Sequence, residues 1–340
     1  MLYYSILFLR CYTVILMLIP ELRELQGIVT KMPLTVCCSM ALPEFGLKWK
    51  QVSRAVRNCR LPMQSSSVAQ VLCEYLAKSM PQDELDDILA RLRLKSVAIQ
   101  ERTWHVLHLH EPTDQEPISE LLHILPHRVL TALQSCKKGT MKPEVQSLLV
   151  GELLYLSVRF ASQARDGATL YLATPPGHPV AYFSTLPGEK LLQACVEGLG
   201  FASFTRASLQ GSHIPSLHRV ASGAWHAAAP APYAPAPAPT LNGIDYTHAH
   251  YDKQYVDKLI GPNPPLLTEL NIKTTCDFFD RARLNKTINL SLHLKSENIA
   301  TTLKTWVTKG AIAADSGFIK LIQETRSNKI TYTKEVSESE

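Results

Sequence analysis

The segment Lys48–Arg60 concentrates charged side chains that could bind a phosphate backbone. Its thirteen residues include five cations and no acid, namely Lys48, Lys50, Arg54, Arg57 and Arg60. At helical spacing the middle three share one face, because residues three and four apart are neighbours on a helix surface. Such a run can neutralise phosphates along a DNA strand, and each contact would add to the salt dependence of binding. The charge pattern alone also fits the solvated face of an ordinary helix.

A second group with possible chemistry is the run W-H-V-L-H-L-H, in which His105, His108 and His110 follow Trp104. A helix would place His105 and His108 side by side as candidate metal ligands. No acid or cysteine stands at ligand spacing within this run, so we expect surface histidines and no metal site. The acids of Asp83–Asp87 could form an acid–base pair, but they precede a helix that ends in cations. This order indicates a helix start that complements the macrodipole.

The rest of the sequence predicts no catalytic or cofactor site. The eight cysteines are scattered and contain no C-x-x-C pair, which is typical of reduced thiols in a cytosolic or nuclear protein. Gly198 and Gly200 lack the third glycine of a phosphate-binding loop, and there is no G-x-S-x-G nucleophile elbow. The net charge of +5 permits an anionic partner without requiring one. We therefore expect a protein that is not an enzyme and uses no cofactor.

The elements that would position the basic run form an all-helical bundle over residues 21–110. Apolar residues recur at helical spacing in Glu21–Lys31, in the segment after Ser65 and in the segment after Asp83. In the basic run itself, the two valines between the cations would face this core. The bundle would therefore present Lys50, Arg54 and Arg57 to solvent.

Residues 1–20 form a separate apolar segment. Arg10 interrupts the apolar run, and the charged n-region of a signal peptide is missing. We interpret the segment as a buried amino-terminal piece or as an upstream extension, with translation starting at Met17. A membrane tether is the alternative.

Residues 111–222 predict a second, α+β domain. A helix over about 118–136 precedes alternating strand patterns at 154–160, 169–173 and 180–184. A helix over 189–199 and a further strand from Phe201 follow. The pattern indicates an antiparallel sheet flanked by helices.

The last part of the chain follows an Ala/Pro-rich linker at residues 223–241. Such a run forms an extended spacer and cannot form a core. In the C-terminal α+β domain, 242–335, residues 287–294 alternate apolar and polar, which predicts a strand with one buried face. We expect Ser296 to cap the next helix, Lys309-Gly310 to end it, and residues 329–333 to form a closing strand. The fold class is therefore α+β.

Short motifs in consistent order resemble the centromere protein N family. The C-terminal part resembles the family's amphipathic helix, its G-I-A-D-like turn and its N-K-x-x-x-Y-like last strand. Further forward, the chain resembles the family's K-x-P helix end, its S-V-x-Q-x-L helix, its W-x-V-F-x-M segment, its P-Y-A-F-T-S strand and its L-L-x-Q-A-L helix. The residues that carry these motifs are Ile28–Pro33, Ser67–Leu72, Thr103–Leu109, Pro179–Ser184, Leu191–Ala194, Gly243–Asp245, Leu303–Asp315 and Ser327–Tyr332. The resemblance runs with gaps from about residue 21 to 335.

This resemblance implies an inner-kinetochore subunit of the constitutive centromere-associated network, with a pyrin-like helical domain at its front. Members read the nucleosome that carries the centromeric histone variant CENP-A. They also contact double-stranded DNA through its backbone and join other inner-kinetochore subunits. The C-terminal domain is implied to form a heterodimer with a centromere protein L homologue. The implied location is the nucleus, at the centromere of the chromosome, and no membrane is involved.

The resemblance also implies site residues, with departures from the family pattern. Pro62 and Ser65 stand where the family is basic, an expected arginine pair before Ser216 is missing, and the first helix has lost basic positions at Gln26 and Gly27. The first helix could still meet an arginine-bearing histone loop through Glu21 and Glu24. The candidate DNA contacts are Lys31, Lys48, Lys50, Arg54, Arg57, Arg60, Arg128, Arg206 and Arg219. The candidate partner interface is Ile288, Leu290, Leu292, Leu303, Trp306 and Tyr332.

A second hypothesis comes from a different functional class. A small helical domain at the front of the chain is also typical of death-fold signalling adaptors, which bind another such domain and have no role on chromatin. This hypothesis predicts binding to a protein partner that does not depend on DNA.

Overall fold

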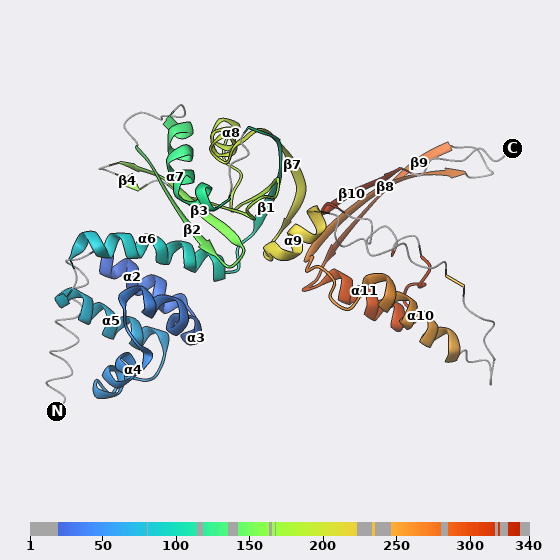
Figure 1. Cartoon of the computed structure of the whole chain (residues 1–340). Helices are drawn as coiled ribbons and strands as arrows, with labels where there is room; N and C mark the ends of the chain where they lie inside the picture. The colour runs from blue at the N-terminus through green and yellow to red at the C-terminus, as the bar shows by residue number, and fades with distance from the viewer. Residues whose placement is uncertain are drawn as a thin grey trace. The chain divides into compact units, whose positions relative to one another are not determined.

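The chain has an α+β fold, as predicted, in a computed structural model (Figure 1). It describes residues 20–79, 81–113, 118–134, 142–162, 165–166, 168–222, 233–234, 246–279, 285–316, 319 and 326–333. The predicted apolar segment 1–20 lies outside these residues except for Pro20, and most of the predicted linker does so too.

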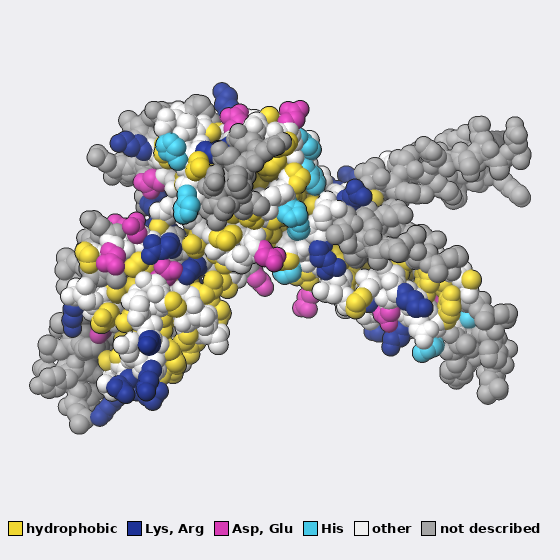
Figure 2. Space-filling model, in the orientation of Figure 1, with side chains coloured by type: hydrophobic (Ala, Val, Ile, Leu, Met, Phe, Trp, Pro, Cys, Tyr) yellow, Lys and Arg dark blue, Asp and Glu magenta, His cyan; other side chains and the backbone are white. Residues whose placement is uncertain are grey.

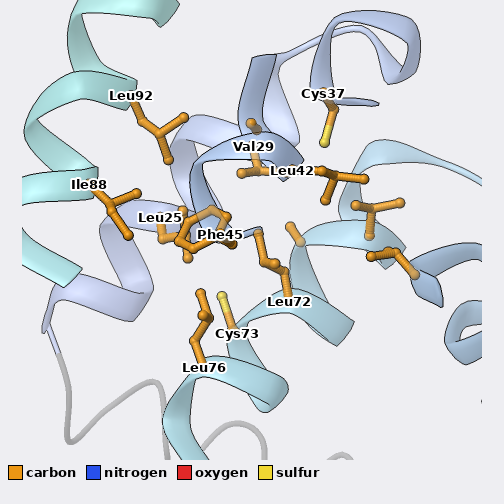
Figure 3. Packing of buried hydrophobic residues seen from close by; sticks show 14 of the residues in the cluster. Leu25, Val29, Cys37, Leu42, Phe45, Leu72, Cys73, Leu76, Ile88 and Leu92 are labelled. Carbon is orange, nitrogen blue, oxygen red and sulfur yellow. The ribbon is translucent and has the colours of Figure 1, made fainter. Parts of the chain in front are cut away.

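The front of the chain is a helical bundle built around one apolar core. Its elements are α2 (Pro20–Lys31), α3 (Leu34–Val36), the single turns η1 (Cys37–Ala41) and η2 (Leu42–Phe45), α4 (Trp49–Asn58), α5 (Ser65–Ser79) and α6 (Gln82–Ile99). Leu25 and Val29 of α2 meet Leu72 of α5 and Ile88 of α6 in this core (Figure 3). Leu25 and Val29 are fully buried, so the helical periodicity of the sequence marked the correct face.

Ion pairs tie α6 to the elements that precede it in the bundle. Arg91 Nε and Lys95 Nζ donate to the two oxygens of Glu44, at 2.8 and 2.5 Å. Arg93 donates to both oxygens of Glu24 on α2, with its Nη2 at 2.7 Å from Oε2. The sequence predicted only that the cations near the end of this helix complement its dipole. In the structure, Arg91, Arg93 and Lys95 also hold the bundle together through ion pairs.

The first sheet has the strand order β2-β3-β5-β6-β1-β7, with β4 beside β3. Its strands are β1 (Trp104–Pro112), β2 (Lys142–Val150), β3 (Leu153–Ser162), β4 (Arg165–Asp166), β5 (Leu170–Thr174), β6 (Val180–Phe183) and β7 (Phe201–Gly211). The strand pairs with a described register in this sheet are antiparallel, as predicted for this region. Helix α7 (Ile118–Gln134) packs on β2, and α8 (Glu189–Gly198) and α9 (Ile214–Ala221) pack on β7.

Residues 104–112 form a strand, which corrects the prediction of an all-helical domain up to residue 110. This strand, β1, pairs with both β6 and β7, and its register shifts between His105 and Leu107. Because of this bulge, Trp104 and Val106 before it and Leu107 and Leu109 after it are all buried. The two adjacent apolar residues at the bulge interrupt the alternation that would have identified a strand.

The C-terminal part is a second sheet with two helices beside it. The sheet has the order β10-β8-β9, in which β8 (Glu269–Phe279) pairs antiparallel with β9 (Asn285–Lys295) and parallel with β10 (Lys329–Thr333). Helices α10 (Tyr246–Ile260) and α11 (Ile299–Thr308) pack against each other (Figure 1). The cap of α11 is Asn298, which accepts from the amides of Ala300 and Thr301. The expected cap, Ser296, lies two residues earlier and accepts from the amide of Asn298 at 3.2 Å.

One buried asparagine joins the second sheet to β7 of the first. Asn328 Oδ1 accepts from the Gln210 amide and Asn328 Nδ2 donates to the Glu269 carbonyl, both at 2.6 Å. Its backbone amide also donates to the carbonyl of Ser208, and its carbonyl accepts from the amide of Asn271, both at 2.7 Å. Asn328 is 5% exposed and makes a hydrogen bond with each of its backbone and side-chain polar groups.

The chain divides into two compact units, residues 1–100 with 115–177 and residues 101–114 with 178–340. This division does not follow the predicted domains, because β1 belongs with β6 and β7, and β7 is joined to Asn328. The predicted domain boundaries therefore stay predictions.

Candidate nucleic-acid interface

Helix α4 turns the cations of the basic run to solvent. Lys50, Arg54 and Arg57 are exposed, whereas Val52 and Val56 are buried in the bundle core at 4% and 0% exposure. Lys48, also exposed, occupies the N-cap position, and its amide donates to Gln51 Oε1 at 2.9 Å. Figure 2 shows dark blue side chains gathered at the end of the bundle where α4 lies. We call Lys50, Arg54 and Arg57 the basic face.

No acid of this chain neutralises the basic face among the residues that the structure describes. Lys50, Arg54 and Arg57 have no ion pair there, in contrast to Arg91, Arg93 and Lys95 of α6. Arg60 lies just beyond the helix, exposed, and its φ of 55° turns the chain after the C-cap Cys59. The basic face is therefore available to an anion from outside the chain.

The basic face has a length that suits a phosphate backbone. Lys50 and Arg57 are seven residues apart, which is about 10 Å along a helix with a rise of about 1.5 Å per residue. Each strand of duplex DNA carries one phosphate per about 3.4 Å of the helix axis, so this length faces about three phosphates of one strand. Guanidinium groups stay charged at all ordinary pH values and bind phosphate oxygens through two parallel N–H groups. The arrangement can hold a nucleic-acid backbone, and it contains no group that would read bases.

The remaining candidate DNA contacts are distributed over several elements. Lys31 ends α2 and is exposed, and Arg128 lies half-buried in α7. Arg206 is exposed on β7, and Arg219 is half-buried on α9. The structure thus brings together the α4 cations, while Arg206 and Arg219 belong to the other compact unit.

The two candidate histone contacts are both half-buried within the bundle. The carboxylate of Glu24 is held by Arg93, which gives it a structural role that the sequence did not predict. One carboxylate oxygen of Glu21, Oε2, is buried and has no hydrogen-bond partner in the described part of the chain. Whether either glutamate binds a histone stays a prediction.

The candidate partner interface separates into exposed and buried residues. Leu290 and Leu292 on β9 are 58% and 38% exposed, so the predicted buried face of this strand is open at these positions. Leu303 is 1% exposed and belongs to the packing of α11, and Trp306 beside it is half-buried. Ile288 and Tyr332 lie on β9 and β10, and their side chains are outside the described residues. Leu303 is therefore a core residue of this chain, and its assignment to the interface stays a prediction.

The histidines of β1 lie on a strand and not on a helix. Burial lowers the pKa of His105, and burial together with the nearby His110 lowers that of His108, so both rings are neutral at pH 7. In the described ranges, no three His, Cys, Asp or Glu side chains gather as ligands of a metal ion would. Nor does any described helix have the length and apolarity that a membrane span requires.

Comparison with known proteins assigns no family. No protein-family model matches this sequence, and no curated protein matches it. The features that bear on a function are therefore the basic face, the exposed leucines of strand β9 and the order of the sequence motifs.

Proposed function

We propose that this protein is a divergent inner-kinetochore subunit of the centromere protein N kind. It binds the CENP-A nucleosome and its DNA through the front of the chain. Its C-terminal part forms a heterodimer with a centromere protein L homologue, which recruits further inner-kinetochore subunits. On this proposal it acts in the nucleus, at the centromere, and supports chromosome segregation.

The observation that carries the proposal is the unpaired basic face of α4. Cations that stabilise a fold usually have a partner, as Arg91, Arg93 and Lys95 do. Lys50, Arg54 and Arg57 have none among the described residues, so their charges contribute net repulsion unless an external anion binds. The helical bundle presents these cations to solvent, which agrees with DNA binding by the N-terminal part. The exposed leucines of β9 agree with protein binding by the C-terminal part.

A death-fold-like adaptor is the second candidate. It is favoured by Tyr75 on α5, which is 52% exposed, because tyrosine is enriched among the residues that dominate protein interfaces. This candidate explains the helical bundle but leaves the basic face without a role.

A gel-shift titration with two kinds of nucleosome tests the proposal. The full chain, co-expressed with a centromere protein L homologue, is titrated against CENP-A nucleosomes and ordinary nucleosomes at two salt concentrations. We expect binding to both, tighter for the CENP-A nucleosome, and weaker at the higher salt because counterions are released from phosphates.

The outcomes distinguish the candidates. Equal binding to both nucleosomes would retain a DNA-binding kinetochore scaffold and remove the selective reading of the histone variant. Absence of binding to either nucleosome would contradict the proposal and favour the adaptor.

A further inference from the structure

A single tyrosine of the Ala/Pro-rich linker is bound to helix α10. Tyr233 lies in the run A-P-A-P-Y-A-P-A-P, and its ring packs against two tyrosines of α10. The ring centroids are 5.4 Å apart for Tyr233 and Tyr251, and 5.1 Å apart for Tyr233 and Tyr255. The predicted spacer is therefore anchored at this position.

The two tyrosines of α10 form a platform because they are one helical turn apart. Their rings are nearly parallel, with an interplanar angle of 13° and centroids 6.5 Å apart. Tyr233 meets them edge-on, at 69° and 78°, which is the arrangement that aromatic rings prefer. Tyr255 is 8% exposed and makes the buried base of the platform.

Two hydrogen bonds fix the position of the bound segment on this platform. The Tyr233 hydroxyl donates to Asp252 Oδ1 at 2.5 Å, and the Ala234 amide donates to the Tyr251 hydroxyl at 3.3 Å. Asp252 lies between the two platform tyrosines in the sequence. The contact thus recognises a tyrosine side chain by its ring and its hydroxyl, and it also recognises the backbone amide that follows.

The sequence around Tyr233 suits binding by such a platform. Proline fixes φ near −65°, so alternating Ala-Pro sequence favours an extended polyproline conformation before it binds. Aromatic surfaces are the usual receptors of such segments, because little conformational entropy is lost on binding. A tyrosine flanked by Ala-Pro repeats is therefore a good ligand for a two-tyrosine platform.

We propose that Tyr251, Asp252 and Tyr255 form a binding site for a tyrosine within an extended Ala/Pro-rich peptide, which Tyr233 occupies in cis. This site does not depend on the proposed kinetochore function. Occupancy divides the linker into two shorter tethers at Tyr233 and closes the α10 platform to proline-rich segments of other proteins.

The tether makes occupancy in cis strong even where the contact itself is weak. Only eleven residues separate Ala234 from the start of α10 at Tyr246. A short linker of this kind gives an effective concentration on the order of millimolar. A free peptide with a similar intrinsic affinity therefore cannot displace Tyr233 at micromolar concentration.

Titration with a labelled linker peptide tests the site. The probe is a fluorescent peptide of residues 227–239, and its anisotropy is measured with the full chain and with two variants. Tyr233→Ala empties the platform, and Tyr233→Phe keeps the ring contact but loses the bond to Asp252. We expect the peptide to bind Tyr233→Ala at least tenfold more tightly than the unaltered chain, with Tyr233→Phe between them.

Two controls define the site on α10. The double variant Tyr233→Ala with Asp252→Ala removes the hydroxyl acceptor and should bind the peptide more weakly than Tyr233→Ala alone. A peptide whose tyrosine is replaced by alanine should not bind any of these proteins. The proposal would be overturned if the peptide bound the unaltered chain, Tyr233→Phe and Tyr233→Ala with equal affinity. It would also be overturned if adding Asp252→Ala to Tyr233→Ala left the affinity for the peptide unchanged.

Discussion

Arg54 on α4 and Arg91 on α6 belong to one residue type but stand in two electrostatic settings. Arg91 has Glu44 at 2.8 Å, and Lys95 binds the same carboxylate. Arg54 is exposed and has no ion pair among the described residues. The same charge therefore stabilises the fold in one place and is available for binding in the other.

Reversing the basic face should weaken binding to nucleosomal DNA. With Lys50→Glu, Arg54→Glu and Arg57→Glu combined, we expect at least a tenfold loss of affinity at low salt. Because each phosphate contact contributes about −0.9 to the slope of log K against log salt, the slope should become shallower by about 2.7. Gel shifts at several salt concentrations measure both quantities.

A charge-matched variant is the control for this experiment. Lys253→Glu, Lys258→Glu and Lys309→Glu change the net charge by the same amount at exposed positions on other helices. This control should bind as the unaltered chain does. Equal losses in the two triple variants would assign the effect to net charge and remove α4 from the DNA site.

Neutralising Glu44 should destabilise the bundle in a pH-dependent way. Burial alone would raise the pKa of the Glu44 carboxyl, but the hydrogen bonds from Lys95 and Arg91 outweigh burial and hold the pKa below its ordinary value of 4.5. The ionised carboxylate thus stabilises the fold above pH 4.5, and this stabilisation is lost as the pH falls through the lower pKa of the folded state. We expect Glu44→Gln to lower the free energy of unfolding by about 1–2 kcal/mol at pH 7.

Urea denaturation at pH 7 and at pH 3 measures this effect. The difference between Glu44→Gln and the unaltered chain should shrink at pH 3. A difference of the same size at both pH values would show that the ion pairs do not contribute through the charge of Glu44.

At the scale of elements, local periodicity predicted much of the secondary structure. The helices near residues 21–31 and 189–199 and the strand at 287–294 are present as α2, α8 and β9. Gly310, with a φ of 69°, ends α11 as expected of a C-terminal glycine. These features depend on residues within one or two turns of each other, which is the range over which sequence pattern acts.

The elements and contacts that the sequence pattern did not predict depend on residues far apart in the sequence. Strand β1 is defined by partners about seventy to one hundred residues later, and its bulge hides its alternation. The Arg93–Glu24 pair joins residues 69 positions apart, and no pattern in either helix marks it. For the candidate site, the sequence predicted the basic face. It did not predict that no acid in the described part of the chain pairs with that face, because pairing is a property of the packed bundle.

Substitution of two leucines in the C-terminal part should have very different effects on the free energy of unfolding. Leu303 is buried in the packing of α11, so Leu303→Ala should lower the free energy of unfolding by about 2–4 kcal/mol. Leu290 is 58% exposed, so Leu290→Lys should change it by less than about 0.5 kcal/mol. Chemical denaturation of the two variants measures the difference.

Pull-down with a centromere protein L homologue completes this comparison. We expect Leu290→Lys to reduce pairing, since a charge would enter an apolar contact surface. Undiminished pairing would exclude this part of β9 from the interface.

At the scale of the whole molecule, Asn328 makes one compact unit out of segments that the linker separates. It bonds Gln210 on one side of the linker and Glu269 on the other. Its substitution would leave a part-buried amide and a part-buried carbonyl without these partners, which is costlier than the loss of a fully exposed hydrogen bond.

Substitution of Asn328 should therefore loosen the attachment of the second sheet to β7. We expect Asn328→Ala to lower the free energy of unfolding by about 1–3 kcal/mol, because two part-buried groups lose their hydrogen-bond partners. Hydrogen exchange of the peptide covering residues 201–211, followed by mass spectrometry, should be faster in this variant. Ser327→Ala, which loses the exposed bonds of its hydroxyl to the Ser208 carbonyl and the Lys329 amide, is the milder control.

The position of β1 between β6 and β7 also governs when the protein can fold during synthesis. Trp104–Pro112 leaves the ribosome well before both of its neighbours, and Gly211 follows Pro112 by roughly one hundred residues. At a synthesis rate of about 5–20 residues per second, this apolar strand waits about 4–14 s for β6 and about 5–20 s for β7. The core of the helical bundle ahead of it is formed by residues between Leu22 and Leu92, all of which are synthesised before Trp104, so its folding has no such delay. The nascent chain thus passes through a stage in which a folded bundle carries an unpaired apolar strand, and this strand is where a chaperone would bind.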